Sequence, residues 1–122
     1  MSRREVLAVS VPSLAERRQR IENEPLPPNV AALLDDAAAE VPDQTALDFF
    51  EAGERLSYGE LHRRVNRLAN GMARRGISNR SHVGVMLPNI AALPITWLAP
   101  ARLGAVMVPM NKIGRASWRE RV

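Results

Sequence analysis

Few side chains in this sequence have the types and spacing that catalysis requires. His62 and His82 are the only histidines, and neither has a second histidine or a carboxylate at a spacing typical of zinc ligands. We expect each to occupy a surface or strand-edge position instead of acting in catalysis. The adjacent carboxylates Asp35 and Asp36 fall on the polar face of an expected helix, where both should face water. Since the chain has no cysteine, thiolate ligands and a cysteine nucleophile are excluded.

The serines and glycines add neither a nucleophile nor a phosphate-binding loop. Ser13 and Ser57 each precede a glutamate by three residues, which predicts two capping boxes, and no GxSxG motif surrounds them. We expect Tyr58 to pack against the strand before it. None of the seven glycines falls in a GxGxxG or GxxxxGK[ST] motif. The sequence therefore assigns no catalytic, cofactor-binding or metal-binding residue to this chain.

Composition and charge favour one small globular domain. The chain has 122 residues, of which 46% are apolar, and a net charge of +4. The last eleven residues supply +3 of that charge, and the other arginines alternate with glutamates on expected helices, so we expect solvated faces and no nucleic-acid partner. No apolar run approaches the roughly 18 residues of a membrane span. The first twenty residues lack a secretory pattern, so we expect no transmembrane segment and a cytoplasmic location.

Periodicity and capping residues predict four helices and four short strands. We expect helices over residues 13–24, 29–41, 57–75 and 89–103, and strands over 45–50, 55–57, 82–87 and 105–109. The first two strands should form a hairpin. The last two, joined by a crossover helix, should form a parallel βαβ unit. Gly76 should take the left-handed conformation that closes the third helix.

Several finer features of these elements are also predicted. One face of the second helix should bury Val30, Leu33 and Leu34 with Ala37 or Ala38, and Asn29 should cap it. The third helix has a clear apolar stripe, formed by Leu61, Val65, Leu68, Ala69 and Met72. The strand over 82–87 reads as buried on both faces. We expect Asn89 to cap the fourth helix and Pro100 to kink or break it near Ala99.

Four segments in order resemble the N-terminal region of the AMP-forming acyl-CoA synthetases, within the adenylate-forming enzyme superfamily. They are LSYGEL at 56–61, VNRLANGMARRGI at 65–77, HVGVMLPN at 82–89 and LAPARLGAVMVPMN at 98–111. The resemblance covers about residues 29–111. It implies an α/β fold, namely a partial N-terminal subdomain with a small β-hairpin and a βαβ parallel-strand unit flanked by helices. Residues 1–28 would then form an extension with a short helix.

The resemblance implies a fragment of an ATP-dependent carboxylic acid:CoA ligase. The complete enzyme would use a small-molecule carboxylic acid, ATP, Mg²⁺ and coenzyme A. The phosphate loop, the ribose-binding aspartate and the adenylation lysine of that family have no counterpart here. We therefore expect no cofactor in this fragment and no activity from it. The acid and the oligomeric state are not determined by these residues, and the acceptor could instead be a carrier-protein thiol or oxygen.

The end of the sequence resembles translated sequencing adapter. The codons ATC-GGA-AGA-GCG encode the residues from Ile113 to Ala116. The whole segment IGRASWRERV matches one reading frame of a common sequencing adapter except at Trp118, where the adapter encodes cysteine. We therefore predict that residues 112–122 are non-native. The alternative is a genuine basic tail, on a small stand-alone module that binds an acidic protein or RNA.

Overall fold

The structure, a computed structural model, describes residues 11–111 and contains eight helices and strands. Their order is α1 Leu14–Asn23, α2 Val30–Glu40, β1 Thr45–Phe49, β2 Glu54–Ser57, α3 Tyr58–Arg74, β3 His82–Val85, α4 Ala92–Arg102 and β4 Val106–Pro109. All four predicted helices and all four predicted strands are therefore present. The predicted non-native tail, 112–122, lies outside the described residues.

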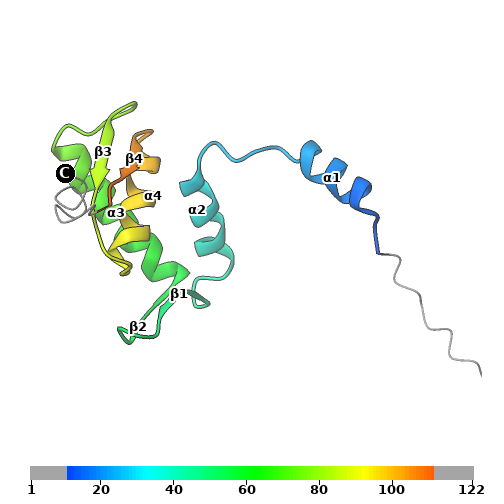
Figure 1. Ribbon diagram of the computed structural model, residues 1–122, viewed down its shortest axis with the longest axis horizontal. Helices are drawn as coiled ribbons and strands as arrows, with labels where there is room; N and C mark the ends of the chain where they lie inside the picture. Colours follow the sequence, from blue (N-terminus) through cyan, green and yellow to red (C-terminus); the bar gives the residue numbers. More distant parts are fainter. Residues whose placement is uncertain (1–10, 112–122) are drawn as a thin grey trace, which may run out of the picture.

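Helix α1 stands apart from the other elements. It forms the predicted capping box, in which the Ser13 hydroxyl accepts the Glu16 N–H and the Glu16 carboxylate accepts the Ser13 N–H. None of its residues is buried, and it contacts no other described helix or strand. Figure 1 shows α1 joined to α2 by an extended connection, whose sequence is PLPP at 25–28. The helix is therefore stabilised by its own caps and the Arg18–Glu22 ion pair and not by packing.

Helix α3 carries the centre of the hydrophobic core. Leu61, Val65 and Ala69 are buried, while Leu68 and Met72 pack against them from its edge, as the apolar stripe predicts. At its start the Ser57 hydroxyl accepts the Glu60 N–H, but the Glu60 carboxylate binds arginines instead of the Ser57 N–H. Only half of the second predicted capping box is therefore present.

The turn after α3 and the turn between α4 and β4 each depend on a glycine. Gly76 closes α3 with φ of +88°, which confirms its predicted conformation. Gly104, with φ of +71°, follows α4 and lies against the turn before β3. A Cβ at this position would lie 2.5 Å from Asn79 Oδ1, so the Asn79 side chain would have to move, and the positive φ would strain any other residue.

Helix α2 packs against α3 and α4 through a narrower face than predicted. Ala31 and Leu34 are buried, whereas Val30 and Leu33 are 53% and 56% exposed. The prediction that Val30 and Leu33 are buried is therefore wrong. The reason is that α2 turns Asp35, which the sequence places on a polar face, toward polar groups of α3 and α4. Its predicted cap is present, since the Asn29 side chain accepts the Ala32 N–H.

The hairpin closes one end of the helical core. Strands β1 and β2 are antiparallel, with Leu47 opposite Leu56 and Asp48 opposite Arg55. Leu56 is 2% exposed and belongs to the core, whereas Asp48 and Arg55 form an ion pair of 3.0 Å on the outer side. Alternation along the strand thus separates a buried face from a solvated one.

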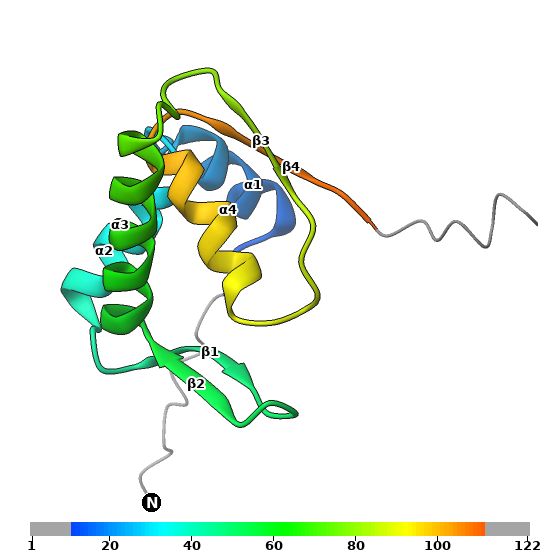
Figure 2. The same cartoon turned by 90° about the vertical axis from the view of Figure 1, so that its left-hand side faces the viewer.

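Strands β3 and β4 form a separate parallel pair, connected through α4, which confirms the predicted βαβ unit. Figure 2 shows this pair along one side of α4, with α2 and α3 on the other side. The prediction that β3 is buried on both faces is wrong for this chain, since only Val85 is buried. A two-stranded parallel sheet has two faces to cover, and the described residues supply one covering helix.

Two expectations for α4 are wrong. The helix begins at Ala92 and has no side-chain cap, because a turn over 88–91 comes between Asn89 and the first helical residue. It also continues without a break to Arg102 across Pro100. Pro100 lies two residues from the end of the helix, so the missing N–H costs a single hydrogen bond of the last turn. The overall class, an α/β fold with a small hairpin and a parallel strand pair, is as predicted.

Candidate functional site

Three helices meet at a polar cluster that we call the Asp35 cluster, formed by Asp35 of α2, His62 and Asn66 of α3, and Arg102 of α4. Arg102 binds both carboxylate oxygens of Asp35, at 3.1 Å to Oδ2 and 2.6 Å to Oδ1. His62 Nε2 lies 2.9 Å from the same Oδ1. A bidentate guanidinium–carboxylate pair fixes both orientation and distance. The cluster therefore holds α2 against α3 and α4.

Asn66 is the fourth member of the cluster. Its amide nitrogen lies 3.3 Å from His62 Nδ1 and 3.4 Å from His62 Nε2. Since His62 Nε2 also lies 2.9 Å from Asp35 Oδ1, the ring is held between a side chain of its own helix and one of α2.

The electrostatics of the cluster favour an ionised carboxylate. The hydrogen bonds from Arg102 lower the pKa of Asp35; burial raises it, and contact with His62 lowers it further. Arg102 is more enclosed than Asp35 or His62, with 24% of its side chain exposed against 43% and 33%. Its Nε is buried without a hydrogen-bond partner among the described residues. Loss of the Asp35 charge would therefore leave a half-buried cation unpaired.

This arrangement is suited to holding helices together and not to catalysis. A His–Asp pair activates a serine or cysteine in many hydrolases, but no hydroxyl or thiol contacts His62 among the described residues. The expectation that Asp35 simply faces water is wrong, whereas Asp36 is exposed as predicted. No local pattern predicts this cluster, because Asp35 is 27 residues from His62 and 67 from Arg102.

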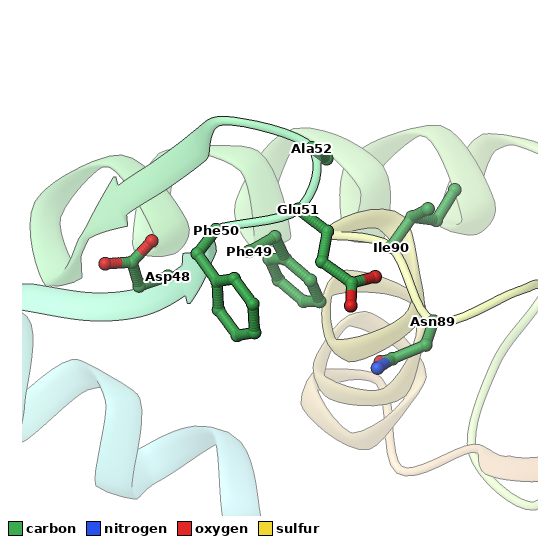
Figure 3. Close-up of a pocket in the computed structure, with 7 residues that line it drawn as sticks. All are labelled: Asp48, Phe49, Phe50, Glu51, Ala52, Asn89 and Ile90. Atoms are coloured by element: carbon green, nitrogen blue, oxygen red, sulfur yellow. The ribbon is translucent and has the colours of Figure 1, made fainter.

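The described residues also form a cleft between the hairpin and the segment before α4. Its volume is about 440 Å³, and its lining consists of Asp48, Phe49, Phe50, Glu51, Ala52, Asn89 and Ile90. Figure 3 shows the two phenyl rings and the Glu51 carboxylate on the hairpin side, with Asn89 and Ile90 opposite. Asn89, expected to cap α4, instead lines this cleft.

The chemistry of this cleft does not suit a phosphate or a carboxylate substrate. Its charged lining groups are the carboxylates Asp48 and Glu51, and no cationic side chain lines it. Asp48 is already paired with Arg55, so a triphosphate placed there would meet the Glu51 carboxylate and no cationic group among the lining residues. The turn after β3 contains Pro88, which has no N–H, and lacks the glycines of a phosphate loop. These residues therefore do not fit ATP, and we assign no catalytic step to them.

The other residues considered from the sequence lie far from any reactive arrangement. His82 is exposed at the start of β3, in the strand-edge position that was expected. Ser13 and Ser57 accept hydrogen bonds as helix caps, and Tyr58 packs against the core. Over residues 11–111 no three histidine, cysteine or acidic side chains come together as a possible metal site. Within that same range no helix is long and apolar enough to cross a membrane.

Comparison with known proteins identifies the family. The profile of the AMP-binding enzymes matches residues 34–119, which is more than half of the chain, so the protein belongs to that family. The match extends into residues 112–119 and gives no support to the prediction that this segment is translated adapter.

Individual relatives agree with this assignment. The chain is 38% identical over 80 residues to a crotonobetaine/carnitine–CoA ligase of Proteus mirabilis, covering 62% of this chain and 15% of the relative. It is 31% identical over 104 residues to tyrocidine synthase 1 of Brevibacillus parabrevis, covering 81% of this chain and 9% of that protein. The N-terminal subdomain of Klebsiella oxytoca NpsA superposes with a TM-score of 0.66 at 26% identity, covering 75% of this chain and 24% of that subdomain. The chain thus spans about 15% or less of the length of these two curated relatives.

Proposed function

We propose that this chain is part of the N-terminal domain of an ATP-dependent carboxylic acid:CoA ligase, in which it serves as scaffold. The family match over residues 34–119 carries the proposal, and the similarity to a CoA ligase supports it. The same match favours a ligase over a stand-alone module that binds RNA or an acidic protein. The proposed domain division follows the resemblance: an extension over 1–28, the ligase segment over 29–111, and a separate tail.

The complete enzyme would form a thioester in two steps. A carboxylate oxygen attacks the α-phosphorus of ATP, the bond to pyrophosphate breaks, and an acyl-adenylate forms. The sulfur of coenzyme A then attacks the acyl carbon, and AMP leaves. Magnesium would neutralise phosphate charge during the first step. A carboxylate requires this activation because it is a poor electrophile until one of its oxygens becomes part of a leaving group.

In this proposal the described residues position other elements and contribute no catalytic group. The Asp35 cluster and the core of α3 fix the three helices, and α4 supports β3 and β4 on its far side. Isolated, the chain should release no pyrophosphate from ATP and carboxylic acids. Turnover by the purified chain that persists after further purification would contradict the scaffold role.

A chimera tests the ligase assignment directly. Residues 34–111 would replace the aligned segment of the Proteus mirabilis CoA ligase, and thioester formation would be measured with that enzyme's own acid. We expect a folded, active chimera, because the replaced segment supplies scaffold and not substrate contacts. A matched chimera with Val65→Asp, which places a charge at a fully buried position, should be inactive. A folded chimera that binds ATP but forms no acyl-adenylate would contradict the assignment.

A second acceptor is supported by one relative. Tyrocidine synthase 1 is similar to this chain over a longer stretch than the CoA ligase, 104 residues against 80. Transfer of the acyl group to a carrier-protein thiol, which the resemblance leaves open, is the alternative second half-reaction. Both alternatives begin with formation of the acyl-adenylate, so measuring that step does not distinguish them. Measuring whether coenzyme A or a carrier-protein thiol accepts the acyl group does.

A further inference from the structure

Helix α3 contains the dipeptide Asn70–Gly71. Of the seven asparagines in the sequence, Asn70 alone is followed by glycine. The side-chain amide of an asparagine is open to attack by the backbone nitrogen of the next residue, and glycine hinders that approach least because it has no Cβ. Asn70–Gly71 is therefore the position in this chain whose residue types most favour deamidation.

Deamidation proceeds in two steps and needs only water as co-reactant. The backbone nitrogen of Gly71 attacks Cγ of Asn70, a C–N bond forms, and the side-chain amino group leaves as ammonia with the proton of the Gly71 amide. Water then opens the resulting five-membered imide. If water breaks the bond from Cγ to nitrogen, aspartate is left at position 70. If it breaks the bond from the main-chain carbonyl carbon to nitrogen, isoaspartate is left instead.

The helical conformation of α3 prevents the first step. Asn70 lies one turn before Arg74, the last residue of the helix. A helical side chain points back toward the N-terminus, so the Asn70 amide is directed away from the nitrogen of Gly71. In the hydrogen-bond pattern of an α-helix, the N–H of Gly71 is also bonded to the carbonyl oxygen four residues earlier. Attack therefore requires this part of α3 to unwind.

The hydrophobic core opposes unwinding at this position. Ala69, which directly precedes Asn70, is 2% exposed and belongs to the core, and Leu68 and Met72 pack against it. Residues on both sides of Asn70–Gly71 are thus held by the core. Fraying of the last turn alone does not release the pair, so it opens only when this stretch of α3 leaves the core. The free energy of that opening sets the fraction of time in which attack is possible.

We propose that Asn70–Gly71 is a deamidation site that the folded helix α3 protects and that reacts when α3 opens. The rate of reaction is then the rate in the unfolded chain multiplied by the open fraction. The residue pair and its helical conformation both belong to this chain itself. The site therefore requires no free surface of α3 in a larger domain, and it does not depend on the proposed ligase function.

The two products differ in their effect on α3. Aspartate at position 70 would lie three residues after Arg67 and four before Arg74, where a carboxylate on a helix interacts favourably with both cations. The helix should therefore tolerate this product. Isoaspartate carries the chain through Cβ and Cγ, which lengthens the backbone and shifts the register of the helical hydrogen bonds. We expect chains with isoaspartate to unfold more easily than unmodified chains.

Deamidation of the purified chain tests this proposal. The chain is incubated at mildly alkaline pH in buffer and, in parallel, in guanidinium chloride that unfolds it. Trypsin then releases residues 68–74 as one peptide, in which mass spectrometry detects the change from amide to carboxylate. We expect deamidation of Asn70 to be at least about tenfold slower in buffer. Asn89 is the internal reference, because the β-branched Ile90 follows it and should make it react much more slowly than Asn70 in the unfolded chain.

Variants that change stability without altering the reacting pair measure the protection. Ser57→Ala removes the cap of α3 and should speed the reaction in buffer by roughly fivefold, the factor that corresponds to about 1 kcal/mol. Val108→Ala is the matched control, since this residue lies in β4 outside the helical core, and it should change the rate by about twofold at most. In guanidinium chloride both variants should react as the wild type does.

A third variant alters the chemistry instead of the protection. Gly71→Ala adds a Cβ that meets no atom within 4 Å in the folded chain, so the helix should form normally. The same Cβ hinders attack by the backbone nitrogen. Deamidation of Asn70 should therefore slow strongly even in guanidinium chloride, and an unchanged rate there would contradict the role of the glycine.

Three further results would overturn the proposal. If Asn70 in the unfolded chain reacts no faster than Asn89, the pair is not a deamidation site. Equal rates for Asn70 in buffer and in guanidinium chloride would show that α3 gives no protection, whether or not circular dichroism finds the chain folded in buffer. An unchanged rate in the Ser57→Ala chain would show that the reaction proceeds without opening of the helix.

Discussion

The helical half of the molecule and its parallel strand pair differ sharply in how completely they are buried. Leu34, Leu56, Leu61, Val65 and Ile95 are at most 8% exposed in the core formed by α2, α3, α4 and the hairpin. In β3 and β4 only Val85 is buried, and Val106 and Val108 are 49% and 39% exposed. Helices α2, α3 and α4 pack on one another, because each contacts the other two. The strand pair has one covering helix, so its conformation depends more on whatever else packs against it.

The largest expected effect separates these two regions directly. Leu56→Ala removes a nearly fully buried side chain and should lower the free energy of unfolding by about 2–5 kcal/mol. Val108→Ala, in the exposed strand, should change it by less than about 0.5 kcal/mol. Urea denaturation followed by far-UV circular dichroism measures both. Equal losses would mean that the strand pair is as well packed as the core.

The Asp35 cluster gives the next effect. Asp35→Asn keeps the shape but removes the charge that pairs with Arg102, and should cost about 1–3 kcal/mol. Asp36→Asn is the matched control, since Asp36 is exposed and should change stability by less than about 0.5 kcal/mol. The same urea titration compares them. Similar values for the two variants would show that the cluster does not hold the helices.

The pH dependence of stability tests the contribution of the Asp35 carboxylate in a second way. Hydrogen bonds from Arg102 lower the pKa of Asp35 in the folded chain, so its contribution is fully present above the ordinary carboxylate pKa, about 4. That contribution is lost as the pH falls through the lowered value. The wild type should therefore lose stability on acidification more steeply than Asp35→Asn. Parallel pH profiles for the two proteins would rule out this linkage.

The two helix caps allow a smaller comparison, between a packed helix and an isolated one. Ser57→Ala removes the cap of α3 and should cost about 1 kcal/mol of global stability. Ser13→Ala removes the same interaction from α1, which contacts no other described element, so the global unfolding midpoint should not change. Thermal melts would measure the midpoints, and an equal shift from Ser13→Ala would mean that α1 packs on the rest of the chain.

The smallest effect is a stabilisation. Gly71→Ala adds a methyl group in open space inside α3 and should raise stability by about 0.5–1 kcal/mol. Gly76→Ala is the contrasting variant, because φ of +88° strains any other residue, and it should lower stability. Chemical denaturation of both variants gives the sign. Destabilisation by Gly71→Ala would show that the space beside Gly71 is filled in the folded chain.

The sequence predicts local features of this fold well and its contacts less well. The apolar stripe of α3, the Ser13 capping box and the left-handed Gly76 are all confirmed, since each depends on residues within one or two turns. The buried face of α2 and the cap of α4 were wrong. Both features depend on contacts outside the segment itself. Asp35 of α2 bonds to side chains of α3 and α4, and the turn over 88–91 separates Asn89 from the start of α4.

By itself the sequence determined the order and type of the elements, the parallel pairing and the family, because periodicity, caps and motif residues are properties of neighbouring positions. Only the tertiary structure decided that Asp35, His62 and Arg102 form one cluster, and that Asn89 lies across a cleft from the hairpin. Such groupings depend on the angles at which helices pack. Those angles are set by the combined fit of many side chains, so no short segment of the sequence encodes them.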